Sequence, residues 1–331
     1  MRAAPPVECK ADHEMEQSLT VGRIKEILAA EGIDVSVEGD ESVAVTTFSD
    51  LSEASEGCLC FYVGSDDSAL RHLNDCVVLT NKSITSVPQS VTRIISDYPK
   101  LAFYITACKQ APGVERSGVH PTAVIDDSTR IDSTASIGAY SIVEKSEIGP
   151  GCAIEGHVVV GRQTLLKGDV TIEPNTTIGA TGQVWAWGLD GKKWVPPQLG
   201  GTEIGFGVFI GANVTIVRGA LQDTVIGDNC RIAHGTRIGH NCRIEAGTFV
   251  SSQVAIPGSV TIGKNCFIGS GAVFRPGVSI GDNIVVGAGS VVTKDFPKSG
   301  AVLVGAPAKV VKYESGGDQL AGIPVQNYRG S

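Results

Sequence analysis

The sequence predicts a mainly β fold: a left-handed parallel β-helix of hexapeptide repeats, with a small α/β domain before it and a C-terminal cap after it. Between residues 224 and 293, an aliphatic or aromatic residue returns at every sixth position, from Ile226 to Val292. A helix repeats at about 3.6 residues and a half-buried strand at 2, so this period requires a chain that turns a corner once per hexad. Composition agrees, because 42% of residues are hydrophobic, only 5% are aromatic, and 41 of 331 are Gly.

Small residues after the periodic residue are expected to form the corners. Gly follows it at these six positions: Gly227, Gly239, Gly263, Gly269, Gly281 and Gly287. We expect a backbone conformation there that would strain a β-branched residue. Three hexads close one triangular turn, so residues three hexads apart stack at about 4.8 Å. One coil alone buries almost no surface, so the pattern must continue over many coils.

The segment before the repeats predicts a small domain. Residues 1–17 are polar, contain two adjacent Pro, and are expected to form a loose tail. Residues 18–116 predict the α/β domain, with one helix expected near 18–33 and a second over 98–108. Short apolar runs separated by polar turns fill the stretch between these helices and are expected to be strands.

The β-helix is expected over residues 117–296, which gives room for about eight or nine coils. Two insertions interrupt the period: residues 179–202, which contain all three Trp, and the RGALQD segment that begins at Arg218. Interruptions in such a fold are loops that leave from one edge, where binding surfaces usually lie. Residues 297–331 predict a cap that folds back over the open end, followed by a tail.

Charge and cysteine content limit the possible functions. A formal charge of −8 and a pI near 5.3 argue against a nucleic-acid or membrane-surface binder. The nine Cys are scattered and predict reduced filler residues, with no disulfide framework and no zinc site. Because no run approaches the length of a membrane span and no signal peptide is visible, we expect a cytoplasmic protein.

Two histidines in the repeats are candidates for chemistry. His234 and His240 are six residues apart, so they should lie on neighbouring faces of one coil and point outward. An outward imidazole can act as a general base, since its ordinary pKa is about 6.5; a solvated surface histidine is an equally good interpretation. A metal site would need three converging His, which this spacing does not offer, so no metal is expected.

Several motifs resemble a known family. The run IGANVTIVRGALQDTVIG, the later GHN, the GVHPTAVID before the first coil and the PQLG that ends the Trp-containing insertion look like the UDP-3-O-acylglucosamine N-acyltransferase family (LpxD). The resemblance extends from about Val21 to Thr293. It implies a homotrimer that transfers a hydroxyacyl chain from acyl carrier protein to the 2-amine of a nucleotide sugar in lipid A and lipopolysaccharide synthesis. It also implies that His240 removes the amine proton, that the Gly258 N–H binds the oxyanion, and that Asn241 neighbours the base.

The sequence also departs from this family. Ala233 and His234 stand where the family has a carboxylate and Asn, and Gly277 replaces a second His. In the segment that resembles the family's uracil-stacking stretch, Phe61 is kept but Asp67 replaces Tyr. The insertion reads GATGQVWAW, which contains Trp185 and Trp187. We expect substrate to contact the following residues: Asn241, His234, Phe61, Trp185 and Trp187.

Three functions remain open from these patterns. The first is the lipid A N-acyltransferase with acyl carrier protein as donor, for which Arg231, Arg237 and Arg243 offer a positive rim. The second is a related acyltransferase that uses a coenzyme A thioester on another nucleotide sugar, which the altered segment and the cap sequence VGAPAKVV favour. The third is a non-catalytic scaffold, against which His240 and Gly258 argue. No cofactor beyond the thioester co-substrate is expected.

Overall fold

The computed structural model of the protein describes residues 19–110 and 118–313. The chain divides into two compact units, which these two stretches represent and which we call the N-terminal unit and the β-helix. Each unit has its own apolar core.

The N-terminal unit is a five-stranded sheet with two helices. Its sheet order is β2-β7-β6-β5-β4, with β2 antiparallel to β7 and the other neighbours parallel. The helices are α1 (Val21–Ala30) and α2 (Pro99–Gln110). The strands are β1 (Leu19–Thr20), β2 (Val35–Glu38), β3 (Ala44–Val45), β4 (Thr47–Phe48), β5 (Cys58–Tyr62), β6 (Val77–Thr80) and β7 (Thr92–Ser96), and β1 pairs with β3.

Local sequence accounts for the first helix. The Thr20 side chain accepts a hydrogen bond from the Arg23 N–H and caps the start of α1. The apolar side of α1 buries Val21, Ile24, Ile27 and Leu28 in the core. Gly32, with φ of 75°, allows the chain to leave the helix, as the sequence predicted.

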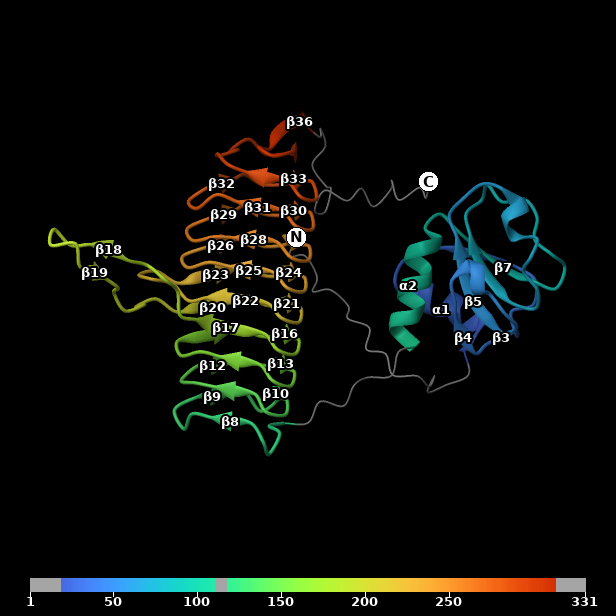
Figure 1. Cartoon of the computed structure of the whole chain (residues 1–331). Helices are drawn as coiled ribbons and strands as arrows, with labels where there is room; N and C mark the ends of the chain where they lie inside the picture. The colour runs from blue at the N-terminus through green and yellow to red at the C-terminus, as the bar shows by residue number, and fades with distance from the viewer. Residues whose placement is uncertain (1–18, 111–117, 314–331) are drawn as a thin grey trace. The chain divides into compact units, whose positions relative to one another are not determined.

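The β-helix consists of three parallel sheets whose strands alternate along the chain (Figure 1). The nine-stranded sheet contains β8 (Val124–Ile125), β11 (Ile142–Val143), β14 (Val159–Val160), β17 (Thr177–Ala180), β22 (Thr215–Val217), β25 (Arg237–Ile238), β28 (Ala255–Ile256), β31 (Val273–Phe274) and β34 (Val291–Val292). The eight-stranded sheet contains β9 (Arg130–Ile131), β12 (Glu147–Ile148), β15 (Thr164–Leu166), β20 (Thr202–Ile204), β23 (Thr224–Ile226), β26 (Arg243–Ile244), β29 (Thr261–Ile262) and β32 (Ser279–Ile280). The ten-stranded sheet contains β10 (Ser136–Ile137), β13 (Ala153–Ile154), β16 (Thr171–Ile172), β21 (Phe209–Ile210), β24 (Arg231–Ile232), β27 (Phe249–Val250), β30 (Phe267–Ile268), β33 (Val285–Val286), β35 (Ala301–Val304) and β36 (Lys309–Tyr313).

Each coil contributes one strand to every sheet, which confirms the predicted mainly β coil of hexads. The eight strands of the smallest sheet mark eight full coils in the described residues, and β34 and β35 begin a ninth. The last strand, β36, runs antiparallel to β35 and ends the ten-stranded sheet. Neither helix among the described residues has the length and hydropathy of a membrane span.

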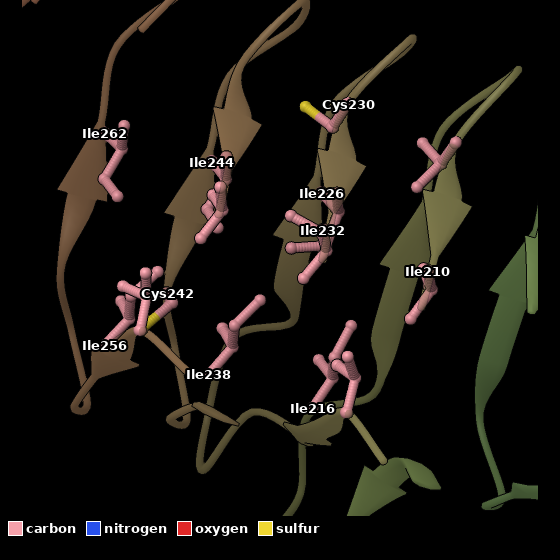
Figure 2. Packing of buried hydrophobic residues seen from close by; sticks show 14 of the residues in the cluster. Ile210, Ile216, Ile226, Cys230, Ile232, Ile238, Cys242, Ile244, Ile256 and Ile262 are labelled. Carbon is pink, nitrogen blue, oxygen red and sulfur yellow. The ribbon is translucent and has the colours of Figure 1, made fainter. Parts of the chain in front are cut away.

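The periodic residues fill the centre of the prism. The inward side chains of successive coils stack on one another, as Figure 2 shows for Ile226, Ile244 and Ile262 on one face. Each of these three is fully buried. Burying one such side chain stabilises the fold by roughly 1.5–3 kcal/mol. The stability of the β-helix is therefore the sum of similar contributions from many stacked coils.

The corner glycines have a different role from the predicted one. None of the six named above adopts a positive φ; the left-handed residue lies two positions later, as at Asn229 (φ 55°) and Asn241 (φ 57°). A Cβ on Gly239 would instead lie 2.5 Å from the Gly258 nitrogen in the next coil. The prediction of strained corner glycines is therefore wrong: at most of these positions Gly is required because the neighbouring backbone is too close.

The cysteines only partly follow the sequence-based expectation. Seven described Cys are free and buried, including Cys230, Cys242 and Cys266 in the β-helix core. Cys108, in α2, is disulfide-bonded, so the expectation of reduced fillers fails at this residue.

Candidate active site

One edge of the prism carries both insertions of the repeat. The insertion of residues 181–201 lies between β17 and β20, and the turn of residues 218–223 lies between β22 and β23. His240 lies between β25 and β26, at the same corner of the next coil. We call this corner, between the nine-stranded and eight-stranded sheets, the His240 edge. The expectation that the insertions leave from one edge is confirmed.

His240 and Gly258 are stacked neighbours on this edge. The register pairs Ile238 with Ile256, and the Ser259 N–H donates to the His240 carbonyl at 2.8 Å, so the two corners are aligned. The imidazole of His240 lies directly against Gly258: a Cβ there would be 2.5 Å from both Cε1 and Nε2. Only glycine leaves room for this ring position, because real Cβ contacts are not that short.

The peptide between Pro257 and Gly258 has a fixed orientation. The Cys242 thiol donates to the Pro257 carbonyl with Sγ and oxygen 3.0 Å apart. Burial raises the pKa of Cys242 to about 11, so the thiol keeps its proton at neutral pH and remains a donor. Since C=O and N–H point in opposite directions across a trans peptide, the Gly258 N–H is directed away from the core. No described residue accepts a hydrogen bond from it.

The two nitrogens of His240 differ in surroundings. Nδ1 is buried and has no hydrogen-bond partner among the described residues, whereas the Nε2 side of the ring lies over Gly258. Buried polar atoms in proteins are almost always paired, so this unpaired ring nitrogen is an unusual feature of the site. A histidine that acts as a base is normally oriented through its second nitrogen, and here no described residue pairs with Nδ1.

Asn241 supports the neighbouring turn. Its Oδ1 accepts a hydrogen bond from the Ala220 N–H at 2.8 Å, which links the His240 corner to the turn of residues 218–223. Asn241 is half-buried and has a left-handed backbone. The structure thus brings Asn241 together with His240 and Gly258, but its acceptor oxygen is already used within the protein.

Arg218 is a further residue of this edge that the sequence did not single out as functional. Its side chain is 2% exposed and donates to the carbonyls of Gly200 at 2.9 Å and Arg162 at 3.2 Å, and to the Gln163 side chain. Gly200 lies near the end of the Trp-containing insertion, and Arg218 is the first residue of the turn of residues 218–223, so the Arg218 side chain links the insertion to this turn. The only sequence signal was an arginine at a break in an otherwise aliphatic repeat.

An apolar groove runs along the nine-stranded sheet beside this edge. It has a volume of about 460 Å³ and starts at Gly239 and Pro257, next to His240 and Gly258. The groove is lined by Thr215, Val217, Arg237, Ile238, Gly239, Ala255, Ile256, Pro257, Val273, Phe274 and Pro276. Arg237 is its one charged residue, so the walls suit a hydrocarbon chain with a polar end.

His234 lies on a different edge from His240. It follows β24, at the corner between the ten-stranded and nine-stranded sheets. Its Nδ1 accepts from the Ala212 N–H at 2.9 Å and lies 3.2 Å from the Glu173 carboxylate. The prediction of neighbouring faces is confirmed, but within the described chain the two imidazoles do not converge on one site.

The two predicted tryptophan contacts lie at exposed positions of the insertion. Trp185 and Trp187 lie on the arm formed by β18 (Ala186–Trp187) and β19 (Lys193–Trp194), which projects from the β-helix (Figure 1). The two rings form an edge-on pair 5.2 Å apart and are 47% and 63% exposed. The arm leaves from the His240 edge, so it brings exposed rings to that side of the prism.

Phe61 belongs to the N-terminal unit, on β5. Its ring packs against Phe103 at 5.0 Å and Tyr104 at 6.2 Å, and it is half-buried. Asp67, which stands where the resembled family has Tyr, accepts from the Thr85 N–H and hydroxyl. These hydrogen bonds hold the pKa of Asp67 below its usual range, so the side chain is an ionised carboxylate.

The repeats match known family models. Residues 222–258 match the model "Bacterial transferase hexapeptide (six repeats)", and residues 259–294 match "Hexapeptide repeat of succinyl-transferase". Together these stretches contain His240, Gly258 and the continuous run of hexads.

Curated relatives and solved structures agree with this result. The chain is 33% identical over 233 residues to UDP-3-O-acylglucosamine N-acyltransferase of Hydrogenovibrio crunogenus, covering 64% of this chain and 65% of that protein. It is 34% identical over 208 residues to the enzyme of the same name from Bordetella pertussis, covering 53% and 54%. The UDP-N-acetylglucosamine O-acyltransferase (LpxA) structure from Moraxella catarrhalis matches with a TM-score of 0.54 and 28% identity, over 59% of this chain and 74% of that one.

These comparisons confirm the predicted left-handed β-helix of hexapeptides and the resemblance to UDP-3-O-acylglucosamine N-acyltransferases. The chain spans 65% of the length of the Hydrogenovibrio relative.

Proposed function

We propose that this protein is an N-acyltransferase that moves an acyl group from a thioester to the amine of a nucleotide-linked amino sugar. The names of the curated relatives, UDP-3-O-acylglucosamine N-acyltransferase, favour the corresponding step of lipid A synthesis. The observation that carries the proposal is the imidazole of His240 against Gly258, beside an apolar groove.

The proposed reaction uses both corners. The sugar amine attacks the thioester carbonyl carbon while His240 takes one proton from the nitrogen. The oxygen that gains negative charge accepts a hydrogen bond from the outward Gly258 N–H. When the tetrahedral intermediate collapses, the carbon–sulfur bond breaks, the amide remains on the sugar, and the proton on His240 passes to the leaving thiolate. The acyl chain occupies the groove along the nine-stranded sheet.

We propose acyl carrier protein as the donor, with no other cofactor. Arg237 and Arg243 are exposed and stand on the two strands that flank His240, β25 and β26, where they can attract an acidic carrier. Arg231 stacks on Phe209 at 4.6 Å on another sheet and is left out of this surface. Replacing Arg237 and Arg243 with Gln should raise KM for the acyl carrier protein without a large change in kcat.

We propose a homotrimer, as the resemblance to the N-acyltransferase family implies. Light scattering on the purified protein should give three times the chain mass, and a monomer with full activity would contradict this. We also propose a cytoplasmic location; seven described cysteines are free, whereas Cys108 is disulfide-bonded. Cell fractionation tests it.

A second candidate is an acyltransferase that uses a coenzyme A thioester on another nucleotide sugar. The ionised Asp67 favours it, because a carboxylate tied to Thr85 cannot stack on uracil as an aromatic residue would. Asp67 therefore bears on the identity of the acceptor sugar nucleotide more than on the identity of the thioester donor.

A thioester-release assay separates the candidates. One reaction contains UDP-3-O-acylglucosamine with a hydroxyacyl carrier protein, and a second contains amino-sugar nucleotides with acetyl coenzyme A. Turnover in the first supports the lipid A reaction; turnover only in the second supports the other acceptor. Absence of turnover with every pair, in a protein that is folded and oligomeric, would contradict the enzymatic proposal and favour a scaffold.

A further inference from the structure

Three cysteine thiols converge in the core of the N-terminal unit. The sulfur atoms of Cys58, Cys60 and Cys76 all lie within 4.8 Å of one another. All three residues are free, and none is more than 1% exposed. No function considered above uses them.

The backbone holds the three thiols together. Cys58 and Cys60 are two residues apart on β5, so their side chains point to the same side of the sheet. The parallel register pairs Leu59 with Val77, which brings Cys76, just before β6, alongside Cys58. Backbone hydrogen bonds from Gly57 N–H to the Asp75 carbonyl and from Thr92 N–H to the Cys76 carbonyl fix the strand ends, at 2.8 and 3.0 Å.

This cluster differs from the cysteines of the β-helix. Cys230, Cys242 and Cys266 are buried singly, and each thiol donates to a carbonyl of the next coil, at 3.2, 3.0 and 3.2 Å. The Cys60 thiol donates to the Val77 carbonyl over a longer 3.7 Å, and it also contacts the Cys58 and Cys76 thiols. Isolated buried thiols are ordinary small hydrophobic residues; three that face one another are a set of soft metal ligands.

We propose that Cys58, Cys60 and Cys76 bind one soft monovalent metal ion of the Cu(I) class. With metal–sulfur bonds of about 2.3 Å, three sulfurs in a plane around one ion would be about 4 Å apart, which small side-chain movements reach from the present positions. Among the described residues, no further His, Cys, Asp or Glu joins the cluster at this distance. Zinc in a structural site takes four protein ligands, so three sulfurs alone fit Cu(I) better.

The surroundings exclude solvent from the three thiols. Leu70, Leu73, Val78 and Ile84 pack around the thiols and exclude water. A buried charge requires direct partners, and thiolates supply them. Three protons pass to solvent as one Cu(I) ion binds, so the site gains a net charge of −2, and no oxidant or reductant takes part.

The test is titration of the full-length protein, with the Cys108 disulfide left intact, with Cu(I) under anaerobic conditions and against the chelator bicinchoninate. Because the sulfurs are fully buried, loading is carried out both on the folded protein and during refolding from urea. We expect one equivalent of Cu(I) that resists the chelator and a near-ultraviolet thiolate-to-copper absorption band. The Cys60→Ser and Cys76→Ser variants should lose at least about tenfold in affinity, since each removes one of three ligands.

Cys266→Ser is the matched control, because it removes an equally buried but isolated thiol. It should retain wild-type Cu(I) affinity. Circular dichroism checks that each variant is folded, and Cys60→Ala replaces any variant that is not. Equal Cu(I) affinity in wild type and folded cluster variants would overturn the proposal. One equivalent of zinc bound more tightly than Cu(I) would overturn the choice of ion.

Discussion

His234 and His240 occupy the same position in successive hexads of one coil, but the structure gives them opposite surroundings. The His234 ring turns toward the preceding coil, where Nδ1 accepts from Ala212 N–H, and it also meets the Glu173 carboxylate from the coil before that. The His240 ring lies over Gly258 of the following coil, and its Nδ1 has no partner among the described residues. The repeat therefore supplies two equivalent backbone positions, and the adjacent coil decides which histidine is available for chemistry.

Replacing each histidine in turn should give the largest difference in kcat between the two positions. We expect His240→Ala to lower kcat about 10³-fold, because a general base contributes 10²–10⁴-fold. His234→Ala should remain within about threefold, since its loss affects only hydrogen bonds on another edge. Steady-state kinetics with whichever substrate pair is active provides the measurement. Similar losses of kcat in the two variants would contradict the proposal that only His240 acts as the base.

The two glycines under these rings offer a paired test. A Cβ on Gly258 would lie 2.5 Å from the His240 ring, and a Cβ on Gly211 would lie 2.7 Å from His234 Nδ1. Gly258→Ala should lower kcat about 10²-fold, the typical cost of moving a catalytic group by about 1 Å. Gly211→Ala crowds its histidine equally and should affect thermal stability without this loss of kcat. Full activity of Gly258→Ala would show that the ring position is not needed.

Asn241 should have a smaller effect through the turn that it holds. Asn241→Gly keeps the left-handed backbone but removes the acceptor for Ala220 N–H. We expect about a fivefold loss of kcat/KM and about 1 kcal/mol of stability, the usual net contribution of one hydrogen bond. Asn241→Asp retains an acceptor oxygen and should restore most activity. If both variants behave alike, the hydrogen bond does not position the edge.

Cys242 should give the smallest effect. Cys242→Ala removes the thiol that donates to the Pro257 carbonyl, so we expect kcat to fall about twofold, because S–H is a weak donor. Cys242→Thr should retain the bond, as Thr236 and Thr248 donate to the equivalent carbonyls of Ser251 and Gly263. Cys230→Ala is the control: it removes the same bond, to Glu245, away from His240. Equal kcat changes in Cys242→Ala and Cys230→Ala would contradict a role in orienting Gly258.

Much of the β-helix could be predicted because its rule is local. Each inward residue is set by period six, so strands, coil number and the stacking of His240 on Gly258 follow from counting. The direction of a side chain at a corner depends on contacts with the next coil, and the period is the same for His234 and His240. For that reason the sequence could not tell which ring would be unpaired.

Contacts between segments that are distant in the sequence could not be predicted from local sequence patterns. The role of Gly239 was wrongly predicted because the close backbone of Gly258 is visible only once the coils are stacked. The buried links from Arg218 to Arg162 and Gly200, and the meeting of Cys58 with Cys76, depend on the register between strands. The residue pattern within one segment does not predict the register between two strands.

The His240 edge also bears on how such a protein can change over time. The strands on either side of the Trp-containing insertion stay paired: β17 with β22 and β15 with β20. An insertion there adds only the slowly growing entropy of closing a longer loop and shifts no inward residue. New recognition surfaces can therefore be acquired, lengthened or lost beside the unchanged corners of His240 and Gly258, and substrate preference can diverge while these two corners are inherited intact.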